Sequence, residues 1–434
     1  DVVQALRNAP RTELGWEYLA VNRRFLASLL GTDVPDAPSW TLIVGFDARK
    51  KLVDYQKKKV TEMMPGLGGR PVEAYQPEIL ALLDEVWYQA SPLHTGFYAE
   101  CTRVKELDDL AQEHLTQAGI ASEEIGQCLL SVNRGRCLYS QYDAFADPWG
   151  HKGMMEALES KLASGGAFYD RPQGALAKQV VDSVPNLREH LRTIKSVTDP
   201  AGILNPGRYV SLDDQAYSPP SVDFDTDEDT GVTPDNISST EEKLKEAIGE
   251  KWVTSNPADL AAYGRDFTIY SGERPNIVVL PENTEDVQKV MRVAYQHKIP
   301  VVPLSTGFNH GGLTIPRKGG ILVDLKRMNR LVEIDEETIT ASFEPGVRMR
   351  NLWQECQKVT TYEGIRLKPI LPLTFGSISL LSNYVSRGGP GSALKYGFGS
   401  DLTVNMTWVL PNGEILRTGP SSVPGVGNLG INWG

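Results

Sequence analysis

The chain has 434 residues, of which 41% are hydrophobic, 23% charged and 8% aromatic, and this composition indicates a globular protein of two to three domains. Its formal net charge of -11 argues against a general binder of nucleic acid or anionic membranes, because those partners are held by basic surfaces. We find no signal peptide and no apolar run long enough to cross a bilayer. The four cysteines show no CxxC spacing and are too few for a secreted disulfide scaffold. Together these features favour a cytoplasmic protein.

Residues 1 to about 150 alternate strand-like runs with helical ones. The runs at 40–46 and 137–142 are apolar and strand-like, whereas 50–64 and 103–118 have the spacing of amphipathic helices. We interpret the dense lysines of 50–64 as a solvated helix face. This pattern predicts an α+β domain, with helices packed on a sheet.

The middle of the chain changes character. Helices are predicted at 152–162 and 187–197, and the acidic stretch 211–237 is rich in Ser, Pro and Asp. That stretch has too few large apolar groups to offset the entropy of ordering, so it predicts a disordered tail or linker.

A strand, an amphipathic helix and a second strand follow in 276–304 and lead into a glycine-rich turn at 305–312. Glycine permits a positive φ, so such a turn can present backbone N–H groups to an anion, although glycine also serves turns that bind nothing. Beyond a predicted helix at 239–248 and this turn, we expect a strand at 320–325, β-structure at 333–345, a helix at 349–357 and a hairpin at 402–417 around Asn412 and Gly413.

Four segments resemble flavoproteins of the vanillyl-alcohol oxidase and p-cresol methylhydroxylase family, which also includes glycolate oxidase and D-lactate dehydrogenase flavin subunits. The segments are 281–312, 320–347, 376–397 and the phrase from Asp199 to Gly207, which is similar to the carboxyl-terminal signature of that family. The resemblance implies a two-domain flavoprotein of the p-cresol methylhydroxylase type, with an FAD-binding domain and a substrate domain built on a central antiparallel sheet.

The same resemblance implies the domain plan and the cofactor contacts. It assigns 1–150 to part of the substrate domain, 151–210 to a carboxyl-terminal segment that folds back towards the FAD domain, 211–237 to a tail or junction, and 238–434 to an incomplete FAD-binding domain. The residues that it implies as FAD contacts are Ser305, Thr306, Gly307, Phe308, Asn309, His310, Gly311, Gly312, Ser377, Ser382, Gly388 and Gly389.

The order of these segments differs from that of the family, because the carboxyl-terminal signature precedes the FAD-binding segments. Two interpretations are a circular permutation and a sequence in which the second part of the protein stands before the first. We prefer the second, and we expect a missing stretch of the FAD domain between Gly434 and Asp1.

The family transfers a hydride from a substrate carbon to flavin N5. Tyr169 and Arg171 stand where aromatic-alcohol members have a tyrosine and an arginine that bind an anionic oxygen, although Arg171 can instead cap a helix or pair with Asp170. His310 replaces a tyrosine and is a candidate general base, orienting hydrogen-bond partner, covalent flavin anchor or structural histidine. Ser386 replaces an acidic residue, which argues against a simple phenol-oxidising mechanism.

Other candidates lie in the substrate domain. Tyr139, Gln141 and Arg136 occur at strand spacing and either line the pocket or pack, and His94 is a second candidate for a covalent flavin bond. The six histidines form no HxH or HExxH pair, so we predict no metal site.

We therefore predict an FAD-dependent oxidase or dehydrogenase for a hydrophobic or aromatic alcohol or methyl compound. The alternative is a 2-hydroxyacid dehydrogenase subunit of a larger electron-transfer complex, whose haem or iron-sulfur centre lies on a partner chain. Either a homo-oligomer or a heteromeric complex is expected. A non-catalytic flavin-binding relative is the third possibility.

Overall fold

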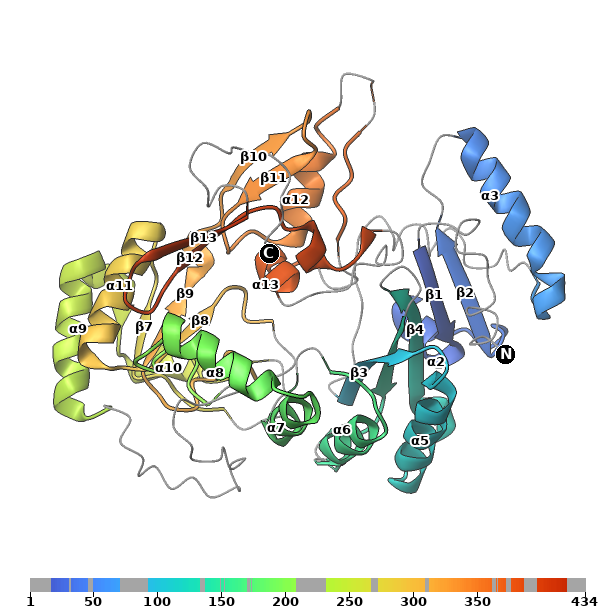
Figure 1. Cartoon of the computed structure of the whole chain (residues 1–434), viewed down its shortest axis with the longest axis horizontal. Coiled ribbons are helices and arrows are strands. Elements are labelled where there is room, and N and C mark those ends of the chain that lie inside the picture. Colours follow the sequence, from blue (N-terminus) through green and yellow to red (C-terminus); the bar gives the residue numbers. More distant parts are fainter. Residues whose placement is uncertain are drawn as a thin grey trace. The chain divides into compact units, whose positions relative to one another are not determined.

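The computed structural model contains two compact units, and each is described by itself (Figure 1). One unit comprises residues 1–170, 368–376 and 383–402; the other comprises 171–367, 377–382 and 403–434. The structure describes residues 17–30, 33–45, 50–70, 93–132, 137–148, 150, 151, 153–169, 172, 174–207, 232–266, 272–308, 312–360, 364, 366–371, 376–385 and 396–419.

A five-stranded antiparallel sheet forms the centre of the first unit, in the order β2-β1-β4-β5-β3. Its strands are β1 (Glu17–Asn22), β2 (Trp40–Gly45), β3 (Leu93–Glu100), β4 (Ile125–Val132) and β5 (Cys137–Ala144). This sheet confirms the predicted α+β fold with a central antiparallel sheet.

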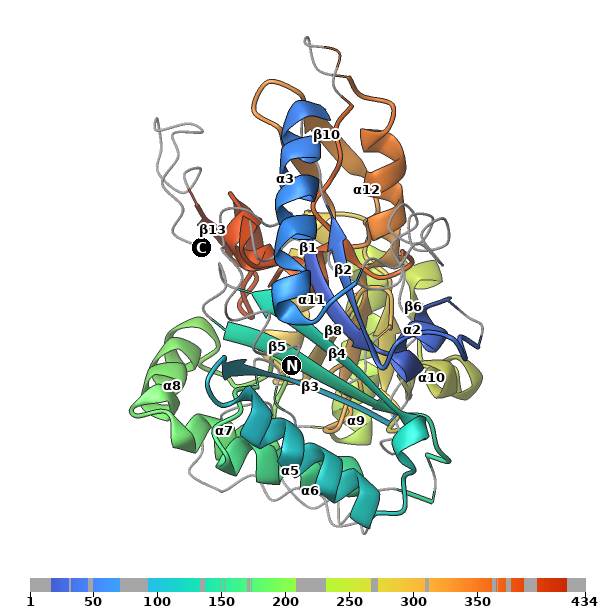
Figure 2. The ribbon, with the colours of Figure 1, turned by 90° about the vertical axis from the view of Figure 1, so that its right-hand side faces the viewer.

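Helices pack on both faces of that sheet. On one face lie α5 (Val104–Gln117) and α6 (Met154–Ser164), which Figure 2 shows alongside β3, β4 and β5. On the other face, α2 (Arg23–Leu30) buries Phe25 and Leu26 in a cluster with Cys128 and Leu130 of β4. The lysine-rich α3 (Lys50–Met63) has no buried side chain, as expected for a solvated helix.

The second unit contains a four-stranded sheet in the order β6-β7-β9-β8. The strands are β6 (Val253–Thr254), β7 (Ile277–Val279), β8 (Val301–Leu304) and β9 (Ile321–Asp324), and the last three run parallel. Helix α11 (Thr284–His297) connects β7 to β8 and packs along α9 (Pro234–Ile248) (Figure 1). Parallel strands joined by a helix place their carboxyl ends at one edge, where α/β sheets usually bind ligands.

Local chemistry sets the bounds of these helices. Asn283 caps α11, because its side chain accepts a hydrogen bond from the N–H of Asp286. Helix α9 starts at Pro234, whereas the sequence predicted a tail up to residue 237 and a helix from 239. Thr233 caps it and Pro234 occupies its first turn, where a missing N–H costs nothing.

Smaller elements complete both units. They are α7 (Gly174–Ser183), α8 (Leu187–Thr198), α10 (Pro257–Tyr263), α12 (Met349–Cys356), α13 (Leu380–Val385), the hairpin of β10 (Leu331–Asp335) and β11 (Thr340–Phe343), and that of β12 (Met406–Val409) and β13 (Ile415–Thr418). Short 3-10 helices are η1 (Pro65–Leu67), η2 (Ser122–Glu124), η4 (Glu250–Trp252), η5 (Leu325–Arg327) and η6 (Gly399–Leu402).

A segment from before α9 joins the second sheet at its β8 edge. Leu204 forms a parallel bridge with Val301, the N–H of Asn205 donates to the Val301 carbonyl, and Ile203 is buried in the core of the sheet. The phrase that resembles a carboxyl-terminal signature therefore lies against the strand that leads into the glycine-rich turn.

Candidate functional site

The glycine-rich turn starts at the carboxyl end of β8. Gly307 has φ +72° and Gly312 has φ +68°, a backbone region that glycine adopts without strain. Among the described residues, a Cβ added at Gly307 would meet Leu304 Cδ1, at 3.6 Å, and no other atom within 4 Å. Asn309, His310 and Gly311 lie outside the described residues.

One backbone carbonyl joins this turn to two other stretches. The carbonyl oxygen of Pro345 accepts hydrogen bonds from Ser305 Oγ at 2.7 Å and from Ser379 Oγ at 2.9 Å. The N–H of Ser379 in turn donates to Thr306 Oγ1 at 3.1 Å. Ser379 is completely buried. We call Ser305, Thr306, Pro345 and Ser379 the serine knot.

Among the predicted FAD contacts that follow residue 376, Ser377 and Ser382 are exposed. The N–H of Ser382 donates to Ser379 Oγ at 3.2 Å, which ties it to the knot. Gly388 and Gly389 lie outside the described residues, as does Ser386. The structure thus brings Ser305, Thr306 and Ser382 together through Ser379, which the sequence analysis did not single out.

A charged group lies at the same edge of the sheet. Asp324 ends β9, opposite Leu304 of β8 in the strand register, and is only 2% exposed. It accepts hydrogen bonds from Tyr263 at 2.8 Å and from Lys326 at 2.9 Å, and Lys326 also donates to the Tyr263 hydroxyl at 2.8 Å. Burial raises the pKa of Tyr263, which therefore stays protonated at neutral pH. The sequence analysis did not single out this group; an aspartate at the end of an apolar strand is the sequence signal that could have found it.

In the first unit, Tyr169 is 5% exposed and packs against Phe97. Thr95 Oγ1 lies 2.9 Å from Glu159 Oε1, to which it donates, and 3.4 Å from the Tyr169 hydroxyl. Burial raises the pKa of Tyr169 and also that of Glu159, to about 7, so Tyr169 is a neutral phenol. Phe168 pairs with Tyr98 of β3, and Arg171 lies outside the described residues.

A polar ladder follows the β5 face that is turned away from α5. Tyr139 donates to Gln141 at 3.3 Å, and Gln141 donates to Asp143 at 2.9 Å. Asp143 is completely buried and stands opposite His94 of β3 in the strand register. Burial, and then the charge of Asp143, raise the pKa of the nearby Cys128, which keeps its thiol protonated. Arg136 lies outside the described residues.

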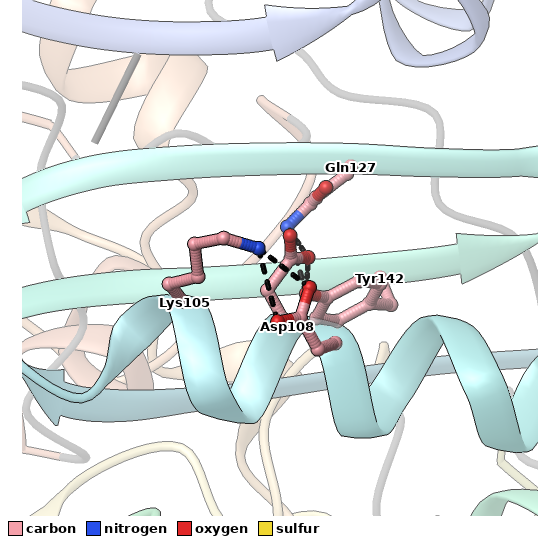
Figure 3. A network of polar contacts seen from close by, with 5 residues as sticks. Lys105, Asp108, Gln127 and Tyr142 are labelled. Carbon is pink, nitrogen blue, oxygen red and sulfur yellow. Dashed lines mark hydrogen bonds and ion pairs between the residues drawn. The ribbon is translucent and has the colours of Figure 1, made fainter. Parts of the chain in front are cut away.

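The opposite face of the sheet holds a second network, which the sequence analysis missed (Figure 3). Gln127 of β4 donates to Asp108 of α5 at 2.7 Å and to the Tyr142 hydroxyl at 2.7 Å, while Tyr142 donates to the same carboxylate. Lys105 pairs with Asp109 one turn along the helix. Because one carboxylate oxygen of Asp108 accepts hydrogen bonds from both Gln127 and Tyr142, this network attaches α5 to the sheet.

Neither a metal cluster nor a disulfide is found where the structure describes the chain. No group of three or more His, Cys, Asp or Glu side chains is placed to hold a metal ion among the described residues. All four cysteines are described, and none of them forms a disulfide. None of the described helices is long and apolar enough to span a bilayer.

Comparison with known proteins identifies one part of the chain. Residues 275–419 match the family described as FAD binding domain. The chain is 30% identical over 178 residues to the glycolate oxidase subunit GlcD of Bacillus subtilis, 30% over 190 residues to a D-lactate dehydrogenase of Anaerostipes hadrus, and 29% over 213 residues to the flavoprotein subunit of 4-cresol dehydrogenase (hydroxylating) of Pseudomonas putida. These matches cover 41%, 43% and 47% of this chain.

The chain spans 37%, 38% and 39% of the length of those three proteins. Among solved structures, 4-ethylphenol oxidase from Gulosibacter chungangensis matches with 29% identity and a TM-score of 0.38, over 45% of this chain and 37% of that one. Substrate-bound p-cresol methylhydroxylase matches with 27% identity and a TM-score of 0.40, over 47% of this chain and 39% of that one.

The matched region contains β7, α11, the glycine-rich turn, the serine knot and the β12–β13 hairpin. The part of the chain that the sequence predicted to bind FAD is therefore the part that matches. Residues 275–419 match an FAD-binding domain, and over this part the chain is similar to FAD-linked oxidoreductases whose FAD-binding domain is of the p-cresol methylhydroxylase type.

Proposed function

We propose that the protein is a flavin-dependent oxidoreductase that transfers a hydride from a hydrophobic or aromatic alcohol or methyl substrate to flavin N5. The observation that carries the proposal is the glycine-rich turn after β8, inside the matched FAD-binding domain. Its backbone at Gly307 has positive φ, and among the described residues one atom, Leu304 Cδ1, lies within 4 Å of an added Cβ, which suits the approach of a pyrophosphate.

The residues present fit FAD. The turn that would hold the pyrophosphate begins with Ser305, Thr306 and Gly307 and ends at Gly312. Ser377 and Ser382 would lie on the other side of the cofactor. Asn309, His310, Gly311, Gly388 and Gly389 stay proposed contacts. When bound, FAD supplies the electron acceptor for the hydride, and the protein supplies binding, orientation and exclusion of water.

The substrate end of the reaction is proposed from the first unit. Tyr169 is a neutral phenol with its hydroxyl beside Thr95, so it would act as a hydrogen-bond donor to an anionic oxygen, and Arg171 would supply the positive charge. Tyr139 and Gln141 lie on the opposite face of the sheet from Thr95, so they are proposed as a separate candidate for contact with the substrate.

His94 and His310 are the proposed imidazoles for flavin attachment or proton transfer. Asp143, opposite His94, is an acceptor that can select the tautomer of that ring. Acid precipitation tests attachment: colour that stays with the protein and is lost in only one of His94→Ala and His310→Ala identifies the anchor. Colour that leaves the unmodified protein excludes both histidines as anchors.

A second candidate is a 2-hydroxyacid dehydrogenase subunit that passes electrons to a haem or iron-sulfur partner. The names of two relatives, a glycolate oxidase subunit and a D-lactate dehydrogenase, favour it. In this case Arg171 would hold the substrate carboxylate through a forked pair of hydrogen bonds. The electron acceptor would then be another chain.

Anaerobic bleaching of the flavin distinguishes the two candidates. We expect aromatic alcohols or alkylphenols to bleach the flavin and glycolate or D-lactate to leave it oxidised; the reverse result would favour the second candidate. Purified protein that binds no flavin would exclude both. With the best substrate, Arg171→Ala should abolish bleaching, whereas Arg188→Ala, which removes a surface pair with Asp182, should not.

A further inference from the structure

Helix α3 is a basic helix in an acidic chain. Its 14 residues include five lysines and two acidic side chains, which give a net charge of +3, whereas the whole chain has a net charge of -11. Figure 1 shows α3 beyond β2, which is the edge strand of the sheet in the same unit. No side chain of α3 is buried, so its charges and its apolar groups can reach a partner.

One side of α3 combines positive charge with exposed apolar surface. Leu52 and Tyr55 are 49% and 51% exposed. Lys51 and Lys58 lie four residues before and three residues after Tyr55, so they flank it on the same side of the helix. Within the described part of the chain, Lys51 has no ion pair and Lys58 has a long one, at 3.8 Å, with Glu62. We call Lys51, Leu52, Tyr55 and Lys58 the lysine face.

The hairpin of β10 and β11 has the complementary composition, and we call its residues 331–343 the acidic hairpin. It contains no lysine or arginine and four acidic residues, which are Glu333, Asp335, Glu336 and Glu337. None of these carboxylates forms an ion pair with another described residue. Val332 and Ile339 are 66% and 71% exposed. The acidic hairpin therefore surrounds exposed apolar side chains with negative charge, as the lysine face surrounds them with positive charge.

A second copy of this chain is the occupant that this composition favours. Every molecule carries both surfaces, and their opposite charges attract, whereas two lysine faces or two acidic hairpins would repel each other. An anionic membrane suits the lysine face less well. A bilayer is an extended plane, so it would also meet the acidic remainder of the surface of a chain whose net charge is -11.

We propose that the lysine face of one copy docks on the acidic hairpin of a second copy. The contact is heterologous, because two different surfaces meet, so it builds either a closed ring of copies or a longer assembly. Both surfaces are small and charged, and the association is therefore weak and sensitive to salt. This contact goes beyond the proposed function and does not depend on the flavin.

Sedimentation velocity of the full chain tests the proposal. At roughly 100 μM protein and about 50 mM salt, the unmodified chain should sediment as more than one copy, and at about 500 mM salt it should sediment as a monomer, because salt screens the charges. The double variants Lys51→Glu/Lys58→Glu and Glu336→Lys/Glu337→Lys should each weaken the association at low salt by at least about 10-fold, because each places like charges opposite one another.

An equimolar mixture of the two double variants gives the sharpest result. One variant keeps the acidic hairpin and the other keeps the lysine face, so the mixture should recover the association that neither variant shows alone. The matched control is Lys243→Glu/Lys289→Glu, which makes the same change in net charge at exposed lysines of α9 and α11. This control should associate as the unmodified chain does. Circular dichroism checks that every variant is folded.

Several outcomes would overturn the inference. They are an unmodified chain that stays monomeric at low salt, a mixture of folded variants that stays monomeric, and a loss of association in the control as large as in the lysine variant. Binding of the monomer to vesicles of anionic phospholipid, lost in Lys51→Glu/Lys58→Glu, would assign the lysine face to a membrane instead. Flavin bleaching by substrate is measured separately, so the proposed function can fail while this contact stands.

Discussion

Glu159 is the described carboxyl group with the clearest change in pKa. Burial raises its pKa from 4.5 to about 7, the neighbouring Glu156 adds to the increase, and the hydrogen bond from Thr95 opposes it. Since the folded pKa is above the unfolded value, the folded state holds an extra proton between these pH values. The resulting stability is present at low pH and is lost as the pH rises through about 7.

Replacing Glu159 with Gln should therefore flatten the dependence of stability on pH. The unmodified protein should lose up to about 3 kcal/mol of unfolding free energy between about pH 5 and about pH 8, and Glu159→Gln should lose much less. Urea unfolding at the two pH values measures the difference. Glu123→Gln, at an exposed position, should retain the loss; a Glu159→Gln variant with the same loss as the unmodified protein would contradict the assignment.

The roles of individual residues could be predicted only in part from the sequence. The motif around Tyr169 indicated a substrate contact, but its neighbours Thr95 and Glu159 come from β3 and α6, and no local pattern links them. Ser379 gave no signal, because a serine in a glycine- and serine-rich stretch is ordinary until folding brings it to Thr306. Side-chain environments depend on contacts between distant segments, which periodicity does not encode.

The backbone conformation just before β9 requires a glycine at position 320. Gly320 has φ +83°, and a Cβ there would lie 2.2 Å from the Pro300 carbonyl oxygen. Gly320→Ala should lower the unfolding free energy by at least about 2 kcal/mol, because it combines backbone strain with overlap against main chain that cannot move. Thermal unfolding measures this loss.

Gly66→Ala is the matched control for that change. Gly66 lacks positive φ, and no atom lies within 4 Å of an added Cβ, so its stability should change by no more than about 0.5 kcal/mol. Equal effects of the two substitutions would refute the steric explanation.

Most elements could be predicted from the sequence, and the reasons are physical. The amphipathic periods of α5, α11 and α12 and the turn residues Asn412 and Gly413 are local signals, and the structure has these helices and this hairpin. The start of α9 was predicted too late, because the acidic composition of the preceding stretch outweighed the Thr-Pro cap. Strand order within each sheet had no local signal.

The chain contains two compact units, and the matched residues 275–419 belong mostly to the second, with 368–376 and 383–402 in the first. Two relatives are named as subunits, and the second candidate function proposes a partner chain for this protein. If this protein passes electrons to such a partner, a pull-down of the protein from its native host should also recover haem or iron-sulfur iron. Elemental analysis should then give a constant ratio of that iron to flavin. Oxidation by dioxygen alone at the full turnover rate would contradict a required partner.

Asp199 connects α8 to the segment that bridges β8, and it is nearly buried. It pairs with Lys195 at 2.7 Å and accepts the N–H groups of Ile203 and Leu204 at 3.1 Å and 2.9 Å. Asp199→Ala should cost about 3 kcal/mol, since it leaves those groups without their acceptor. Asp182→Ala, which removes surface pairs with Lys178 and Arg188, should cost less than the loss of Asp199, and equal losses in chemical denaturation would contradict the assignment.

The bridge between Leu204 and Val301 also protects the protein from self-association. β8 is the outer strand of its sheet, and such an edge offers unpaired N–H and carbonyl groups to any passing strand. The segment at 203–205 occupies the groups of Val301 with its own backbone, next to the turn proposed to hold FAD. Release of this segment would expose the unpaired groups of an edge strand, which are a template for aggregation, beside the turn proposed to hold FAD.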